Sequence, residues 1–207
     1  MKKLKTILIL SLLTIGMVSV NAQENVQEIA QGIRWGVKGG LNVSNVTDLD
    51  ADYRAGFNVG VMGQYMISPA LGVEAGLFYS MQGYKKDILA VQKELVSKTM
   101  TASYLKLPIQ AIYKFNVGQN LYLYPAAGLY FAYGMGGSST DRVDAAGVVR
   151  KDGYFDDAQR FDMGLALGLN VQFERYIIGI GYDYGFLKVI HSGSHNSNVM
   201  VNVGYLF

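Results

Sequence analysis

Eight segments of the chain alternate apolar and polar residues with a period of two. The last segment ends at the chain terminus, and its odd positions are Val199, Val201, Val203, Tyr205 and Phe207. Its even positions are polar or small, ending in Asn202 and Gly204. Because successive side chains of a strand point to opposite faces, one face of this strand is apolar and the other is polar. Repeated segments of this kind are typical of a small β-barrel whose outside faces lipid.

The alternation divides the chain into strands joined by connections of unequal length. The eight segments cover residues 33–44, 57–67, 71–79, 105–115, 121–133, 161–173, 176–186 and 199–207. Only the segment 176–186 has its apolar residues at even positions. Short connections at 68–70, 116–120 and 174–175 alternate with longer ones at 45–54, 85–99, 136–160 and 188–197. We therefore expect an eight-stranded antiparallel up-and-down barrel with turns on the periplasmic side and loops outside. For 85–99 the pattern fits both a short helix and an extended hairpin arm, whereas 136–160 is a charged surface loop.

The N-terminal residues have the pattern of a secretory signal. Lys2, Lys3 and Lys5 precede an apolar run over 7–20, and Ala22 ends a small-residue cleavage site. The run is shorter than the roughly 20 residues of a membrane anchor, the alternative interpretation. We predict a cleaved signal at 1–22, a short periplasmic lead at 23–32 and a barrel at 33–207.

The charge balance disfavours one class of partner, and the cysteine content excludes disulfides as a source of stability. Without Lys2, Lys3 and Lys5, fifteen basic residues remain against sixteen acidic ones, which disfavours nucleic acid as a partner. The chain has no cysteine, so its stability in an oxidising compartment must come from hydrogen bonds and packing.

Aromatic residues on the apolar face cluster at the strand ends, as the two girdles of a membrane barrel do. The expected periplasmic girdle comprises Trp35, Tyr65, Tyr113, Phe115, Phe173, Tyr176, Tyr205 and Phe207. The expected outer girdle comprises Phe57, Tyr79, Phe131, Tyr133, Phe161, Tyr184 and Phe186. A soluble barrel would place its apolar residues inside, but here the charges share the face of Gly and Asn. Outward Lys or Arg near midplane, which would cost about 2 to 4 kcal/mol each, is absent from the assigned strands.

Several segments resemble the small outer-membrane β-barrel proteins of Bacteroidetes, the porin-family or PorT-like barrels. The first strand is similar over residues 36–44 (GVKGGLNVS), the third over 76–83 (GLFYSMQG) and the fourth over 104–109 (YLKLPI). The later strands are similar over 162–168 (DMGLALG) and 182–185 (YDYG). The resemblance covers nearly the whole mature chain, and it lies in the order of these segments. It implies a fold and an outer-membrane location, and no particular activity.

Eight charged residues fall on the polar face of the strands. They are Arg34, Lys38, Lys106, Lys114, Glu74, Asp162, Glu174 and Asp183. In an eight-stranded barrel side chains just fill the bore, so we expect these balanced charges to form a hydrogen-bonded plug. A path for a substrate or for protons is the alternative.

The segment His195-Asn196-Ser197-Asn198 is similar to the histidine-x-serine-asparagine segment of outer-membrane lipid A deacylases. A Ser-His pair needs a carboxylate to orient the imidazole, and no Asp or Glu follows His195. We therefore interpret the segment as an exposed loop leading into the last strand, and a lipid hydrolase using His195 and Ser197 as the alternative.

The carboxylates of Asp48, Asp50 and Asp52 have the spacing of a calcium loop, but Tyr53 and Val59 occupy the positions of its glycine and bidentate glutamate. His191 and His195 are separated by Ser-Gly-Ser, which disfavours a helix that could pair them as ligands. We expect no metal and no cofactor.

The sequence thus predicts a non-enzymatic integral outer-membrane barrel with a side-chain-filled lumen and a structural or surface-binding role through its outer loops. The expected partners are outer-membrane lipid, lipopolysaccharide and the barrel-assembly machinery, which would recognise the terminal Phe207 strand. A PorT-like secretion-machinery subunit is a further alternative.

Overall fold

The computed structural model describes residues 32–46, 52–89, 95–143, 149–153, 159–188 and 195–207. The expected signal at 1–22 and nearly all of the lead at 23–32 lie outside these residues. The described elements are all strands: β1 (Ile33–Val46), β2 (Asp52–Met66), β3 (Leu71–Leu89), β4 (Leu95–Tyr113), β5 (Phe115–Gly118), β6 (Leu121–Val143), β7 (Val149–Gly153), β8 (Phe161–Phe173), β9 (Tyr176–Lys188) and β10 (His195–Leu206). No helix long and apolar enough to cross a membrane occurs in this described part of the chain.

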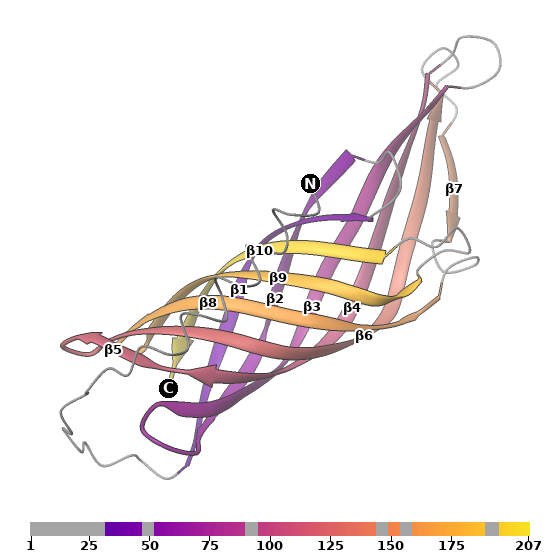
Figure 1. Cartoon of the computed structure of the whole chain (residues 1–207). Coiled ribbons are helices and arrows are strands. Elements are labelled where there is room, and N and C mark those ends of the chain that lie inside the picture. The colour runs from indigo at the N-terminus through magenta and orange to yellow at the C-terminus, as the bar shows by residue number, and fades with distance from the viewer. Residues whose placement is uncertain (1–31, 47–51, 90–94, 144–148, 154–158, 189–194) are drawn as a thin grey trace, which may run out of the picture.

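Eight of these strands close into an antiparallel ring. The order runs β4-β3-β2-β1-β10-β9-β8-β6, and β6 pairs back to β4 (Figure 1). The first and last strands form one seam, from Gly36 opposite Leu206 to Val46 opposite Asn196. At the end of this seam the Phe207 amide donates to the Trp35 carbonyl at 2.8 Å. The predicted eight-stranded fold is therefore confirmed.

The strands meet in tight turns at one end of the ring, which we call the turn end. Phe173 pairs with Tyr176, leaving Glu174 and Arg175 as a two-residue turn. Glu174 has φ 50°, the left-handed conformation that such hairpin turns require. Its amide also donates to the Asn120 carbonyl of the neighbouring turn at 2.9 Å. Glu174 was expected to face the lumen; this prediction is wrong, because the residue is exposed in the turn.

At the opposite end three strands continue beyond the ring as an antiparallel extension, which we call the arm (Figure 1). β3 pairs with β4 as far as Leu89 opposite Leu95, and β4 pairs with β6 as far as Val96 opposite Val143. β7 adds a short fourth strand against β6. Residues 85–89 and 95–99 pair as strands, which favours the extended hairpin over the short helix for the described part of 85–99; residues 90–94 lie outside the described residues. The arm also corrects the expectation for 136–160, part of which continues β6 and forms β7.

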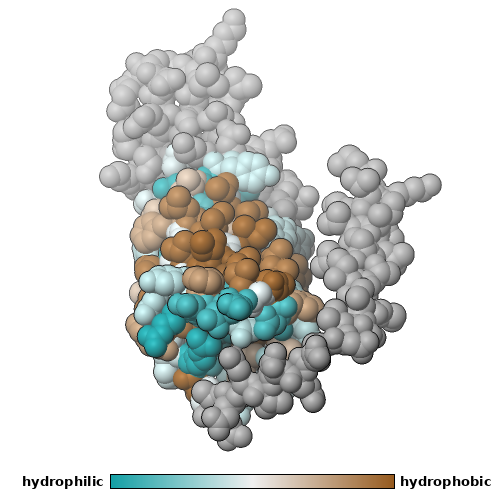
Figure 2. Space-filling model, turned by 90° about the vertical axis from the view of Figure 1, so that its left-hand side faces the viewer, coloured by the Kyte–Doolittle hydropathy of each residue, from teal (hydrophilic) through white to brown (hydrophobic). Residues whose placement is uncertain are grey.

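The outward face of the ring is apolar on every strand. Trp35, Leu41, Val59, Leu77, Ile109 and Ile178 are among the large hydrophobic side chains that remain exposed. Figure 2 shows such side chains gathered in a broad field that hydrophilic residues border. The even-numbered outward set on β9 is confirmed as well, since Ile178 and Ile180 are exposed whereas Ile177 is buried. A soluble barrel would have the reverse arrangement.

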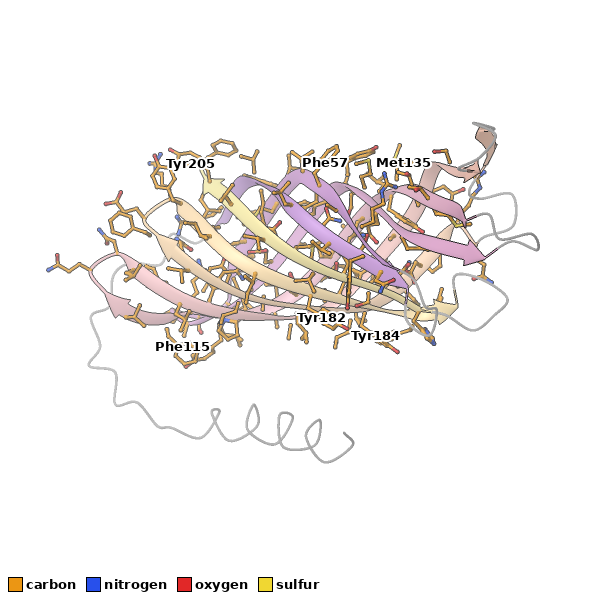
Figure 3. All side chains as sticks on the ribbon, turned by 90° about the horizontal axis from the view of Figure 1, so that it is seen from above. Phe57, Phe115, Met135, Tyr182, Tyr184 and Tyr205 are labelled. Atoms are coloured by element: carbon orange, nitrogen blue, oxygen red, sulfur yellow. The ribbon has the colours of Figure 1, made fainter. Side chains whose placement is uncertain are left out.

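Outward aromatic side chains lie toward both ends of the ring. Tyr205 and Phe115 lie toward the turn end, whereas Phe57 and Tyr184 lie toward the other (Figure 3). Ring contacts between neighbouring strands hold these aromatic side chains. The ring centroids of Tyr176 and Tyr205 are 5.3 Å apart, and those of Phe57 and Tyr79 are 5.8 Å apart. This arrangement is the one expected for the aromatic girdles at two membrane interfaces.

The inward face alternates large side chains with glycines, because so narrow a ring has room for few side chains per layer. At Gly164 a Cβ atom would lie 2.7 Å from the Tyr130 ring and closer still to the Tyr184 carbonyl. At Gly76 a Cβ atom would lie 2.5 Å from the Phe78 ring. The glycines therefore make space for the rings that fill the bore.

We predict that Gly164→Ala lowers the free energy of unfolding by about 1 to 3 kcal/mol, the usual cost of overpacking a filled interior. Gly136→Ala is the matched control, because a Cβ atom at Gly136 would have no neighbour within 4 Å. The measurement is urea unfolding of both variants in lipid vesicles. Equal stability of Gly164→Ala and the wild type would show that the Tyr130 ring is not confined as described.

Candidate functional site

The polar interior contains two hydrogen-bonded networks, one in each half of the barrel. The first is centred on Glu74 of β3. Its carboxylate accepts from Lys38 Nζ at 2.6 Å and from Gln64 Nε2 at 2.8 Å. The Tyr124 hydroxyl donates to the same carboxylate at 3.4 Å. Four strands thus meet at one buried carboxylate.

Lys114 extends this first network toward the turn end without contacting a carboxylate directly. Its ammonium donates to Gln64 Oε1 and to Gln172 Oε1, both at 2.7 Å, and lies 5.3 Å from the centroid of the Tyr124 ring. Gln172 in turn donates to the Glu174 carbonyl at 2.8 Å. Two neutral amides and a ring therefore hold this buried cation.

The second network occupies the half nearer the arm. Lys106 pairs with Asp183, and its ammonium lies 4.5 Å from the centroid of the Tyr130 ring. The Tyr130 hydroxyl donates to Asp162 at 2.9 Å, and Asn196 donates to the same carboxylate at 2.8 Å. The network therefore joins β4, β6, β8, β9 and β10.

Between the networks lies a cavity of about 60 Å³ lined by both ion pairs and by Asn58, Asn170 and Asn202. The Nδ2 atom of Asn58 and the Oδ1 atom of Asn202 have no hydrogen-bond partner in the structure. One buried water needs roughly 10 to 15 Å³ on this scale, so the cavity has room for a few waters that would satisfy these groups.

An apolar cluster closes the bore toward the turn end. Met62, Ile112, Ile177 and Leu206, which come from four different strands, are each at most 1% exposed. Toward the arm the Tyr84 and Tyr104 side chains are buried as well. The described interior is thus a packed core around a small cavity.

Most of the sequence-predicted lumen charges lie in these networks. Lys38, Glu74, Lys106, Lys114, Asp162 and Asp183 are all buried, and two of the expected internal ion pairs form. Arg34 is half-buried on the same face, opposite Gln64 in register. The sequence reasoning missed the neutral partners Gln64, Gln172, Tyr124, Tyr130 and Asn196. The sequence feature that these five residues share is a polar side chain at an inward-facing position of a strand.

The hydrolase hypothesis gains no support from the contacts of its two residues. The His195 ring stacks on the Tyr184 ring at 5.7 Å between centroids, and Ser197 Oγ donates to the Tyr182 hydroxyl at 3.3 Å. Asp162 contacts the intervening Asn196, whose side chain lies on the inward face. The barrel wall therefore separates Asp162 from the outward-facing Ser197.

Among the described residues there is no group of three or more His, Cys, Asp or Glu side chains that could hold a metal ion. Asp48, Asp50 and His191 lie outside those residues, and Asp52 begins β2.

Three solved structures illustrate what the fold is similar to. Ail, the attachment invasion locus protein of Yersinia pestis, is 17% identical over 84% of this chain and 98% of its own, with a TM-score of 0.45. OprG from Pseudomonas aeruginosa is 13% identical over 86% and 97%, with a TM-score of 0.45. Neisserial surface protein A is 15% identical over 84% and 97%, with a TM-score of 0.42. No curated protein matches the chain.

Residues 21–191 match the family model described as the outer membrane protein beta-barrel domain, which spans most of the chain. The closed antiparallel ring and its apolar outer face agree with that match. The chain therefore belongs to the outer membrane β-barrel domain family.

Proposed function

We propose that this protein is a sealed, non-enzymatic outer-membrane barrel whose role is to hold the arm beyond the membrane as a binding surface. The observation that carries the proposal is the combination of a filled bore with an arm that continues past the ring. A barrel that transports solutes needs an open lumen, whereas a scaffold needs a rigid base and an exposed projection.

The contacts of the bore support the sealed state. A permeating ion would have to separate the Lys38–Glu74 and Lys106–Asp183 pairs and displace the apolar cluster around Ile112 and Leu206. Breaking a buried ion pair leaves an uncompensated charge and costs several kcal/mol. We expect these networks to act as structural cross-links between strands.

The composition of the arm supports a surface role. From Tyr79, at the outer girdle, to Leu89, strand β3 continues for about 33 Å at 3.3 Å per residue. One row of its register pairs Lys86 with Lys98, Lys98 with Asp141 and Asp141 with Arg150. Charged rows of this kind favour water over lipid, so we expect the arm to stand outside the bilayer.

Export and assembly are part of the proposal. The signal at residues 1–22 would direct export to the periplasm and be cleaved, and the assembly machinery would then recognise the terminal strand ending in Phe207. That strand forms the closing seam with β1, so its recognition would couple insertion to closure.

Two alternative functions have requirements of their own. The first is a PorT-like secretion-machinery subunit, as the resemblance to the Bacteroidetes barrels suggests. This role requires a protein partner that co-purifies with the chain. A lipid hydrolase requires a carboxylate within reach of His195 and Ser197 on the outward face.

The arm can be located with single cysteines, because the natural chain has none. We predict that Ser97→Cys, in the arm, reacts with a membrane-impermeant maleimide on intact cells. Asn116→Cys, at the turn end, is the matched control and should react only after the outer membrane is permeabilised. The reverse labelling pattern would contradict the proposed orientation.

The seal can be tested by electrical recording. We predict that the purified protein gives no stepwise currents in planar bilayers, because the ion pairs and the apolar cluster fill the bore. Insertion is verified by protease protection of the same preparation in vesicles. Regular stepwise currents from the inserted wild type would disprove the sealed scaffold and support a path through the central cavity.

A further inference from the structure

Four outward side chains form a cluster on β9 and β10 near the arm end, which we call the rim patch: Tyr182, Tyr184, His195 and Ser197. It contains the stacked Tyr184 and His195 rings, inclined by 24°, and the hydrogen-bonded hydroxyls of Ser197 and Tyr182. Figure 3 shows Tyr182 and Tyr184 on the outside of the ring, away from the bore. None of the functions discussed above uses this pairing of two rings with two hydroxyls.

The rim patch lies where the apolar belt ends. Ser197 is opposite Tyr184, and Val199 is opposite Tyr182 in the next outward row. Toward the turn end the same two strands present only aliphatic residues over the following rows, including Ile178, Ile180 and Val201, each more than half exposed. On the arm side His195 is opposite Lys188 in register, after a register shift between His195 and Ser197. The outward side chains of β9 and β10 therefore change from aliphatic to aromatic and polar toward the arm.

Other parts of the outer girdle lack this combination. Tyr133 on β6 is opposite Phe161 on β8 and Leu105 on β4, a wholly apolar or aromatic row. Tyr79 has a hydroxyl partner in Ser103 at 2.8 Å, but its ring neighbour is Phe57. An imidazole stacked on a phenol beside a second hydroxyl pair is thus specific to the β9–β10 face among the described residues.

We propose that the rim patch binds the sugar headgroup of an outer-leaflet glycolipid, as in lipopolysaccharide. The inference rests on the proposed outer-membrane location and adds a specific lipid site to it. The occupant follows from continuity with the lipid belt, because the aliphatic rows below the patch accept acyl chains of the same molecule.

Each part of the headgroup has a matching group on the chain. The C–H faces of a sugar ring pack on aromatic rings, and the amphipathic Tyr184 and His195 rings provide such a platform at headgroup level. The hydroxyls of Tyr182 and Ser197 both donate and accept, as sugar hydroxyls do. An unglycosylated phospholipid would satisfy only the aliphatic rows.

Native mass spectrometry of the folded, detergent-solubilised protein tests the site. The protein is mixed with equal amounts of lipid A and phosphatidylethanolamine, and the lipids that stay bound are counted. We expect the wild type to retain lipid A preferentially. Tyr184→Leu combined with His195→Leu should reduce the retained lipid A roughly three- to tenfold, the scale of a lost aromatic contact. Tyr133→Leu, the matched control in the outer girdle on β6, should retain it as the wild type does.

Two results would overturn the proposal. One is equal retention of lipid A by the wild type and the double variant. The other is an equal loss in Tyr133→Leu, which would assign the effect to the girdle in general. If the double variant does not fold, Tyr182→Phe combined with Ser197→Ala removes the hydroxyl pair alone, with reduced retention expected and unchanged retention contradicting the site. Cysteine labelling and conductance report on the scaffold separately, so failure there is distinguishable from failure of the lipid site.

Discussion

Backbone hydrogen bonding inside a bilayer is the constraint on which the rest of this structure depends. Hydrocarbon offers no partner to a peptide group, so each spanning strand must pair on both edges. The chain meets this condition through the β1–β10 seam, which joins its two ends in one register and finishes with the bond from Phe207 to Trp35. The outward apolar rows follow from the same hydrocarbon environment.

Closure of only eight strands determines what the interior can contain. So narrow a ring has no room in every layer for two large inward side chains next to each other. This explains why glycines face Tyr130 and Phe78. The polar groups that remain must satisfy one another, because few waters fit. The result is a bore in which Glu74 and Asp183 link strands distant in sequence. Rigidity of this base is what would allow a polar arm to project without support from loops.

The outward half of the structure was predictable from the sequence because lipid imposes one rule on every outward position. The strands, the girdles and the even-numbered set of β9 all follow from that rule. The strand ends beyond the membrane were not predictable in the same way. There polar residues occupy consecutive positions, as at Ser97, Lys98 and Thr99, so alternation ends while pairing continues. The prediction for Glu174 failed because the chain turns after Phe173, so the alternation of inward and outward positions does not extend to Glu174.

Contacts inside the lumen were predictable as a class but not as pairs. Inward parity identified Lys38, Lys106, Glu74 and Asp183, whereas the choice of partner depends on how far each strand is shifted around the ring. Lys114 illustrates this, because its position places it between Gln64 and Gln172 rather than directly against a carboxylate. Two of the four rim-patch side chains, His195 and Ser197, were visible in the sequence as a short histidine-serine segment. Their interpretation changed because the structure places them beside Tyr182 and Tyr184 on the lipid-facing side.

The central claim is that the chain forms a closed barrel in the outer membrane. Its most direct test is the electrophoretic mobility of the detergent-extracted outer-membrane fraction, boiled against unboiled. A closed barrel resists detergent unfolding until it is heated, so the account predicts a faster-migrating band in the unboiled sample. Identical mobility of the two samples, with the protein recovered in the soluble periplasmic extract, would contradict it.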